Sequence, residues 1–376
     1  MKQKMPIAAL LALVLALTAL AGGCQSKTVV VAKVGDQEIT LKQLENAYSS
    51  GLSYASYYGF DTSTDDGIAA YRDYLLDSQI STAMKVYQAK LAGITLTDEE
   101  EASAKETADK NYDDTFQSFV DQATKAGASN VNAYAKTLLT KALLANNTTV
   151  SKLQAQMLED AENDTLVSKH RDAILENVAL TADELAAKYT EELAAQEELF
   201  TSDPTQYFTY ESYSQYGYYA PPLYVPDGFF RVRQILVADE ETALLVKQKL
   251  DAGEDFETLL AQYNTDPGMQ SEANEAGYLV GQGANYVTEF LDAALALTND
   301  GDVSAPVQSD YGWHIIKRVS TEAAHEIPYV DVQSAFDAYE QSKYQSDYYS
   351  DVVAAWVADE TLVTRYPDNY ASVGKE

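Results

Sequence analysis

The segment 229–319 is bounded by two short stretches that read as β-strands, and this pattern constrains the fold of that part of the chain. The second strand covers 312–319, and the first carries apolar side chains at Phe230, Val232, Ile235 and Val237. Helical spacing between the strands predicts three short helices, over 240–250, 256–263 and 289–297. Gly253 ends the first helix, and Asp266-Pro267-Gly268 closes the second. The segment therefore reads as one small domain of mixed helix and strand.

The first residues of the chain have the pattern of an export signal. Lys2 and Lys4 precede an apolar run over 7–21, which is followed by Gly22, Gly23 and Cys24. A run of about 15 residues is shorter than the roughly 20 that a membrane-spanning helix needs. We therefore predict a signal peptide over 1–23 rather than a permanent transmembrane anchor.

Cys24 is the single cysteine of the chain, so an intramolecular disulfide is excluded. It ends the string Leu20-Ala21-Gly22-Gly23-Cys24, which resembles a bacterial lipobox, with Ala21 standing where Leu is usual. The resemblance implies that Cys24 is lipidated and becomes the mature N-terminus. Two or more acyl chains suffice for stable anchoring, so we expect an extracytoplasmic, lipid-anchored protein at the cell membrane.

The charge of the chain is strongly acidic, with 58 acidic against 26 basic residues and a net charge of −32. Loss of residues 1–23 removes Lys2 and Lys4 and lowers the net charge to −34, from 24 basic and 58 acidic residues. Nucleic acid is excluded as an expected partner, because its phosphates require a basic surface. The length predicts two or three domains.

The part of the chain before residue 204 reads as mostly helical. Two short strands flank the turn Gly35-Asp36, and four or five helices follow between residue 65 and about residue 200. Capping boxes start helices at Thr40, Thr97 and Thr181, each with a Gln or Glu three residues later. We assign 24–203 to an N-terminal helical domain with a short hairpin at its start.

Residues 204–227 form a segment that is rich in tyrosine and proline and poor in aliphatic side chains. Its prolines argue against a long helix. The favoured interpretation is an interdomain linker packed on its neighbours. The alternative is an aromatic surface that binds extended polypeptide, because tyrosine buries a large area at low entropic cost. The tyrosines lie at 207, 210, 213, 216, 218, 219 and 224.

The last segment, 322–376, resumes helical spacing until Pro367. Its apolar stripe, which includes Phe336, Tyr348 and Trp356, needs a packing partner elsewhere in the chain.

Ordered motifs over 228–321 resemble the parvulin family of peptidyl-prolyl cis–trans isomerases. The resemblance implies a small antiparallel sheet with helices, rotamase activity, and no metal or other cofactor. The motifs are Arg231-Val232-Arg233-Gln234-Ile235-Leu236-Val237, Gly253-Glu254-Asp255-Phe256, Tyr263-Asn264-Thr265-Asp266-Pro267-Gly268, Gly277-Tyr278, Val287-Thr288-Glu289-Phe290, Gly301-Asp302-Val303-Ser304-Ala305-Pro306-Val307 and Gly312-Trp313-His314-Ile315-Ile316.

Residues 32–40 resemble the opening of the chaperone domain in secretion foldases of the SurA and PrsA type. In those foldases the segment after the isomerase domain packs back on the N-terminal helices. The resemblance thus implies an α+β chain in which one helical chaperone domain is built from both ends, with a parvulin-like domain inserted over 228–321.

The resemblance also implies a set of site residues. On the polar side, His314 and Ser309 match a histidine and a hydroxyl of the family, and Gln234 replaces a second histidine. The family's Cys or Asp position falls at or near Tyr278. Gln234 can still donate and accept hydrogen bonds but cannot titrate. The proline pocket would be lined by Phe290, Tyr286 and Leu279.

Two functions follow from these patterns. The favoured one is a surface-anchored foldase that isomerises Xaa-Pro bonds in unfolded or partly folded secreted polypeptides. The alternative is a holdase chaperone whose parvulin-like module is weak or inactive. A solute-binding lipoprotein is allowed by the lipobox but not supported by the interior motifs. The sequence leaves open whether the protein forms a homodimer.

Overall fold

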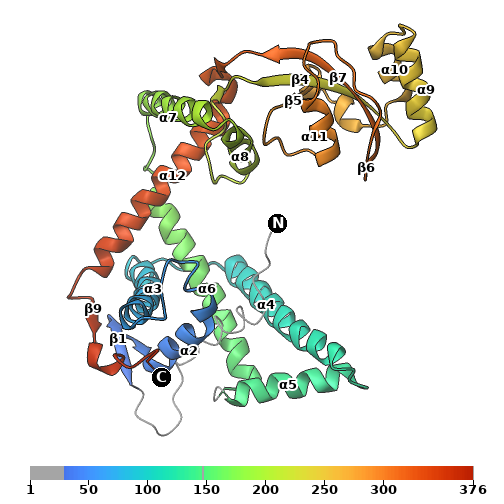
Figure 1. Cartoon of the computed structure of the whole chain (residues 1–376). Helices are drawn as coiled ribbons and strands as arrows, with labels where there is room; N and C mark the ends of the chain where they lie inside the picture. The colour runs from blue at the N-terminus through green and yellow to red at the C-terminus, as the bar shows by residue number, and fades with distance from the viewer. Residues whose placement is uncertain (1–28, 146–147, 376) are drawn as a thin grey trace. The chain divides into compact units, whose positions relative to one another are not determined.

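The computed structural model describes residues 29–145 and 148–375, so the predicted signal peptide and the lipidation of Cys24 lie outside the described residues. The described chain divides into two units (Figure 1). Unit 1 joins the residues up to Val178 with those from Gln345 onwards, and unit 2 is Ala179–Tyr344. Mixed helix and small antiparallel sheets confirm the predicted fold class.

Unit 1 contains a three-stranded antiparallel sheet built from both ends of the chain. Its order is β2 (Gln37–Thr40), β1 (Val30–Val34) and β9 (Val363–Arg365). Val34 of β1 lies opposite Val363 of β9. The helices α2 (Leu41–Gly51) and α3 (Asp65–Leu91) cover this sheet with buried side chains such as Leu44 and Leu76. The predicted construction of one domain from both ends of the chain is therefore confirmed.

Three further helices of unit 1 pack around a second core. They are α4 (Asp98–Lys125), α5 (Val131–Ala145) and α6 (Val150–Leu175), and buried alanines along α4 let α6 approach closely. The predicted capping box at Thr97 is present, with the backbone N–H of Glu100 donating to the Thr97 hydroxyl and the Glu100 carboxylate accepting from the Thr97 backbone. Those at Thr40 and Thr181 are also present.

The helical part of unit 2 consists of α7 (Ala182–Ser202), α8 (Thr205–Ser214) and the start of α12 (Tyr329–Val357), with the short strand pair β3 (Tyr224–Val225) and β8 (His325–Glu326). The sequence predicted that α7 belongs to the N-terminal domain, whereas in the structure it belongs to unit 2. Its Gln196 side chain is buried and accepts from the Leu223 N–H at 2.7 Å while donating to the Pro221 carbonyl at 3.1 Å. Such local bonds hold α7 against the segment that follows it.

The predicted linker contains the short helix α8. Its Tyr207 and Phe208 are buried, and both rings contact Phe229, with ring centroids 5.2 Å and 5.0 Å away. Tyr216 and Tyr218 remain exposed. The start of the segment thus packs on its neighbour, while later tyrosines face solvent.

The rest of unit 2 is built on a four-stranded antiparallel sheet in the order β5-β4-β7-β6 (Figure 1). The strands are β4 (Phe229–Val237), β5 (Tyr278–Val280), β6 (Val307–Ser309) and β7 (Gly312–Glu322). The helices are α9 (Glu240–Asp251), α10 (Phe256–Tyr263) and α11 (Thr288–Leu295), and the predicted helices are confirmed to within two residues. Short 3-10 turns of unit 2 are η2 (Pro267–Gln270) and η3 (Glu272–Asn274), and those of unit 1 are η1 (Leu52–Tyr54) and η4 (Pro367–Asn369).

The central strands separate two cores. Ile235 and Ile315 pack with α9 and α10, whereas Val232 and Ile316 pack with α11. The alternation of side chains along each strand produces this division. The face toward α11 also carries the polar side chains of Gln234 and His314.

Candidate functional site

Two buried polar side chains stand on neighbouring central strands of unit 2. Gln234 of β4 lies opposite Ile316 of β7, and His314 lies two residues before Ile316. Residues two apart on a strand share one face of the sheet, so Gln234 and His314 are diagonal neighbours on that face. Their relative exposures are 6% and 3%. Burial at this level requires hydrogen-bond partners for both side chains.

A chain of hydrogen bonds supplies those partners. Gln234 Nε2 donates to Asp266 Oδ2 at 2.6 Å, and Gln234 Oε1 lies 2.7 Å from His314 Nδ1. His314 Nε2 lies 2.6 Å from the Ser309 hydroxyl. The Tyr278 hydroxyl donates to Asp266 Oδ2 at 2.8 Å. Five side chains from β4, β5, β6, β7 and the loop after α10 are thereby joined in one network.

The chemistry of the partners fixes the direction of these hydrogen bonds. The Asp266 carboxylate accepts, so the Gln234 amide turns its NH₂ group toward Asp266 and its oxygen toward His314. The oxygen can only accept, so His314 carries its proton on Nδ1. Nε2 of the neutral ring is then an acceptor for the Ser309 hydroxyl. The arrangement selects one of the two imidazole tautomers.

Asp266 is held in place by its own loop. Its Oδ1 accepts from the Gly268 N–H at 2.8 Å, and its backbone N–H donates to Asn264 Oδ1 at 3.1 Å. Asn264 Oδ1 also accepts from the Leu236 N–H at 2.9 Å, which ties the loop to β4. Contacts within the loop therefore hold the Asp266 carboxylate in place independently of its hydrogen bond with Gln234.

Burial sets the protonation of the titrating groups. It lowers the pKa of His314, and the nearby Asp266 and Glu289 carboxylates only oppose that shift. Burial and the hydrogen bond to Asp266 raise the pKa of Tyr278, so its hydroxyl stays a donor. At neutral pH the network thus contains a neutral imidazole and a neutral phenol.

The Ser309 hydroxyl sits at a tight hairpin between β6 and β7. Ser309 pairs with Gly312, and its oxygen accepts from the Tyr311 N–H at 3.1 Å. Gly312 has φ of +129°, and a Cβ there would lie 2.4 Å from the Val237 carbonyl oxygen. Glycine is required at this position by both conformation and space. The hairpin thereby brings Ser309 to His314.

Aromatic rings border the network on the side of α11. The Phe290 ring lies 5.6 Å from the His314 ring in an edge-on contact, and the Tyr286 ring lies 5.2 Å from Phe290. The Tyr278 ring is 5.7 Å from Tyr286. The Tyr286 hydroxyl donates to the Leu279 carbonyl at 3.2 Å, which fixes the ring orientation. The result is an apolar wall beside a buried, neutral, hydrogen-bonded group.

The structure brings together most residues that sequence analysis selected. His314, Gln234, Ser309 and Tyr278 share the network, and Phe290 and Tyr286 line it. Leu279 contributes its backbone carbonyl, while its side chain packs toward Phe229. The carboxylate of the network is Asp266, although sequence analysis expected the acidic position at or near Tyr278. Asp266 was missed because Asp-Pro-Gly reads as a loop signal after a helix.

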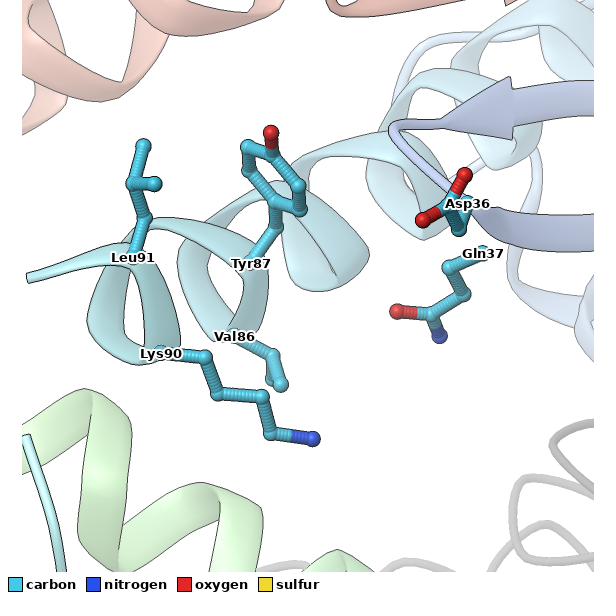
Figure 2. A pocket seen from close by; sticks show the side chains of 6 residues that line it. All are labelled: Asp36, Gln37, Val86, Tyr87, Lys90 and Leu91. Atoms are coloured by element: carbon cyan, nitrogen blue, oxygen red, sulfur yellow. The ribbon is translucent and has the colours of Figure 1, made fainter. Parts of the chain in front are cut away.

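A separate cavity of about 280 Å³ lies in unit 1. Figure 2 shows Asp36 of the turn between β1 and β2 and Gln37 at the start of β2, which line the cavity together with Tyr87 and Lys90 of α3. The cavity shares no residue with the network.

Within the ranges 29–145 and 148–375, no helix is long and apolar enough to span a membrane.

Comparisons with known proteins find relatives for part of the chain. Residues 236–320 match the family described as Rotamase: PPIC-type PPIASE domain. The chain is 44% identical over 107 residues to foldase protein PrsA of Geobacillus kaustophilus, covering 28% of this chain and 37% of that protein. It is 38% identical over 125 residues to foldase protein PrsA of Clostridium acetobutylicum, covering 32% and 36%. The chain thus spans little more than a third of these relatives.

A solved structure is also similar to part of the chain. NmPin, the parvuline of Nitrosopumilus maritimus, is 35% identical and matches 25% of this chain and 98% of its own length, with a TM-score of 0.22.

Proposed function

Because residues 236–320 form a PPIC-type peptidyl-prolyl isomerase domain, we propose that the chain is a foldase that isomerises Xaa-Pro bonds in unfolded secreted polypeptides. The observation that carries the proposal is the juxtaposition of the Phe290 and Tyr286 rings with the ordered His314 network. An apolar wall suits a proline ring, and fixed polar groups suit the amide beside it.

The reaction needs stabilisation of a twisted amide rather than bond chemistry. Amide resonance sets a barrier of roughly 20 kcal/mol, and the unaided reaction takes tens to hundreds of seconds. A catalyst must bind the twisted state better than either planar state. In our proposal, Phe290 and Tyr286 hold the proline ring out of water. The network of His314 and Ser309 offers fixed dipoles near the amide without reorganising during the rotation.

Gln234 fits this role although it cannot titrate. Its amide bridges Asp266 and His314 at 2.6 Å and 2.7 Å, so the network stays continuous. Rotation about the prolyl bond transfers no proton, so a titratable group is not needed at this position. We propose that Asp266 and Tyr278 act as positioning residues that orient Gln234 and hence His314.

We further propose that Cys24 carries the lipid anchor and that the protein acts on the outer side of the cell membrane. The apolar run over 7–21 and the lipobox-like string before Cys24 support this. The strongly acidic net charge of −32 would keep the tethered domains away from anionic headgroups.

A protease-coupled assay on an Xaa-Pro peptide tests the isomerase. We expect turnover well above the buffer rate and a loss of about tenfold or more in Phe290→Ala, since about 1.4 kcal/mol of transition-state binding corresponds to a factor of ten. Leu291→Ala on the same helix is the matched control, and circular dichroism confirms folding of both variants. Turnover at the buffer rate in the wild type would contradict the proposal.

The alternative is a holdase that protects unfolded clients without turnover. The exposed tyrosines after α8, Tyr216 and Tyr218, favour it, because exposed aromatic surface can bind extended chains. Suppression of client aggregation by a protein that shows no isomerase turnover would support this alternative. Failure of the full-length chain to suppress aggregation would exclude it.

A further inference from the structure

We propose that Glu211 of α8 forms a subsite beside the proline pocket that favours a substrate with a lysine or arginine next to its proline. The inference rests on the proposed isomerase function and adds a substrate class to it. Residue 211 lies outside 236–320, the part of the chain that matches the isomerase family.

The first step is that α8 is packed onto the isomerase-type domain. Phe208 stacks on Phe229 of β4 with ring centroids 5.0 Å apart. Tyr207, Ala284 and Tyr286 belong to the same apolar cluster. A Cβ placed on Gly283 would lie 2.8 Å from the Thr205 Cβ, so the loop before α11 touches the start of α8. Both elements belong to unit 2.

The second step concerns the direction in which Glu211 points. It follows Tyr207 by four residues on α8, and residues four apart share one helix face. Its side chain is exposed to solvent. Burial raises the pKa of the Tyr207 phenol, and the charge of Glu211 adds to that shift. Burial also raises the pKa of the Tyr286 phenol to about 12, again with a contribution from Glu211. Because Tyr207 and Tyr286 share one apolar cluster, the face of α8 that carries Glu211 is the face turned toward the ring that lines the proposed proline pocket.

The third step is that this carboxylate has no compensating partner among the residues that the structure describes. Its side chain takes part in no described hydrogen bond or ion pair. Arg231 is the cation whose charge lowers the pKa of both Tyr207 and Tyr286. Arg231 is already committed, because its Nε pairs with Glu322 and its Nη1 donates to the Gly277 carbonyl at 3.1 Å. Surrounding protein atoms partly desolvate Glu211 and raise its pKa.

A partly desolvated, unpaired carboxylate is stabilised by a cation supplied by the ligand. A proline ring placed against Tyr286 puts the neighbouring substrate residue within reach of α8. A lysine or arginine there would pair with Glu211, whereas a glutamate would be repelled. The acidic net charge of −32 acts in the same direction by attracting basic segments.

The test uses the full chain and two sets of short peptides. Lysine, norleucine or glutamate stands directly before the proline in one set and directly after it in the other. Peptide affinity is measured by titration, and isomerisation is measured separately by NMR exchange on the same samples. Norleucine matches the lysine stem without its charge, so the comparison isolates the ammonium group.

We expect lysine to bind about fivefold more tightly than norleucine in at least one set, as for a partly exposed ion pair. Glu211→Gln should remove this preference, so that the lysine and norleucine peptides bind the variant with equal affinity. Glu198→Gln on α7, another exposed carboxylate of unit 2, should keep the preference. Raised salt should weaken it in the wild type.

Equal affinity for lysine and norleucine in both sets would overturn the proposal, as would a Glu211→Gln variant that keeps the wild-type preference. Absence of exchange with every peptide, together with a preference that depends on Glu211 in the titrations, would refute the isomerase function and leave the subsite standing. The two failures are therefore distinguishable.

Discussion

The amide oxygen of Gln234 lies 2.7 Å from Nδ1 of His314, and this contact sets the tautomer of the imidazole. The orientation of Gln234 depends in turn on Asp266, whose carboxylate can only accept from it. Acting through Gln234, Asp266 thus sets which ring nitrogen of His314 carries the proton.

Substitution of Asp266 by Asn should release this control. An Asn amide can donate as well as accept, so the Gln234 amide can turn and both tautomers of His314 become populated. We expect isomerase activity to fall about tenfold, since about 1.4 kcal/mol corresponds to a factor of ten. The ¹⁵N shifts of the His314 ring would report the tautomer directly.

Tyr278→Phe is the matched control for Asp266→Asn, because it removes one hydrogen bond and keeps the carboxylate. Its His314 shifts should stay those of the Nδ1-protonated ring. A single unchanged tautomer in Asp266→Asn would show that Asp266 does not set it.

The pH dependence of stability should carry a signature of His314. Its pKa is lowered in the folded protein, so between that value and the unfolded value of about 6.5 the unfolded chain binds more protons. The contribution of His314 is therefore complete above pH 6.5 and is lost as the pH falls through the folded pKa. Urea unfolding at several pH values between 5 and 8 measures it.

His314→Gln should flatten this dependence relative to the wild type. His325→Gln, which removes an imidazole from the exposed strand β8, is the control. His170 also has a pKa lowered by burial and contributes in the same direction in all three proteins. An identical slope in the wild type and His314→Gln would contradict the assignment.

The contribution of Asp160 of α6 to stability should depend on pH in the direction opposite to that of His314. Burial raises its pKa to about 6, against a hydrogen bond from Gln156 that lowers it. A raised folded pKa favours the protonated native state, so the cost appears as the pH rises through about 6. Asp160→Asn should therefore stabilise the protein by about 1 to 2 kcal/mol at pH 7.5, after discounting for partial exposure.

The gain from Asp160→Asn should vanish near pH 4, where the wild-type group is already protonated. Asp113→Asn, on the exposed face of α4, serves as the control and should change little at either pH. The denaturant midpoints of the wild type and both variants at the two pH values measure the gain in stability. A gain of equal size at both would mean that ionisation is not its cause.

The pairing of β1 with β9 predicts that a substitution in β9 strongly destabilises unit 1. Val363 is 8% exposed and lies opposite Val34. Val363→Asp should destabilise unit 1 by about 3 kcal/mol or more, because a charge is buried without a partner. Thr364→Asp on the exposed face of β9 should stay within about 0.5 kcal/mol of the wild type. Equal thermal unfolding of the two variants would argue against the pairing.

Local chemistry made much of this fold predictable. The helix over 256–263 was found from apolar spacing and the following Asp266-Pro267-Gly268, and its observed bounds are Phe256–Tyr263. The capping boxes at Thr40, Thr97 and Thr181 involve neighbours three residues apart, so the sequence alone reveals them. Such signals depend on contacts within one helical turn.

Contacts between residues far apart in the sequence were harder to predict. Asp266 meets Gln234 across 32 residues of sequence, and no local pattern distinguishes it from an ordinary turn residue. The placement of α7 in unit 2 depends on bonds such as that of Tyr189 to the Ile327 carbonyl, 138 residues away. An amphipathic helix shows that it has a partner but not which one.

The strand pairing of unit 1 also has a consequence for the order of folding. β1 cannot complete its sheet until β9, more than 300 residues later, has been synthesised. Unit 2 is continuous in sequence and needs no such late segment. Because contacts between residues far apart in the sequence form slowly, we expect unit 2 to complete its fold before unit 1, whose sheet depends on β9.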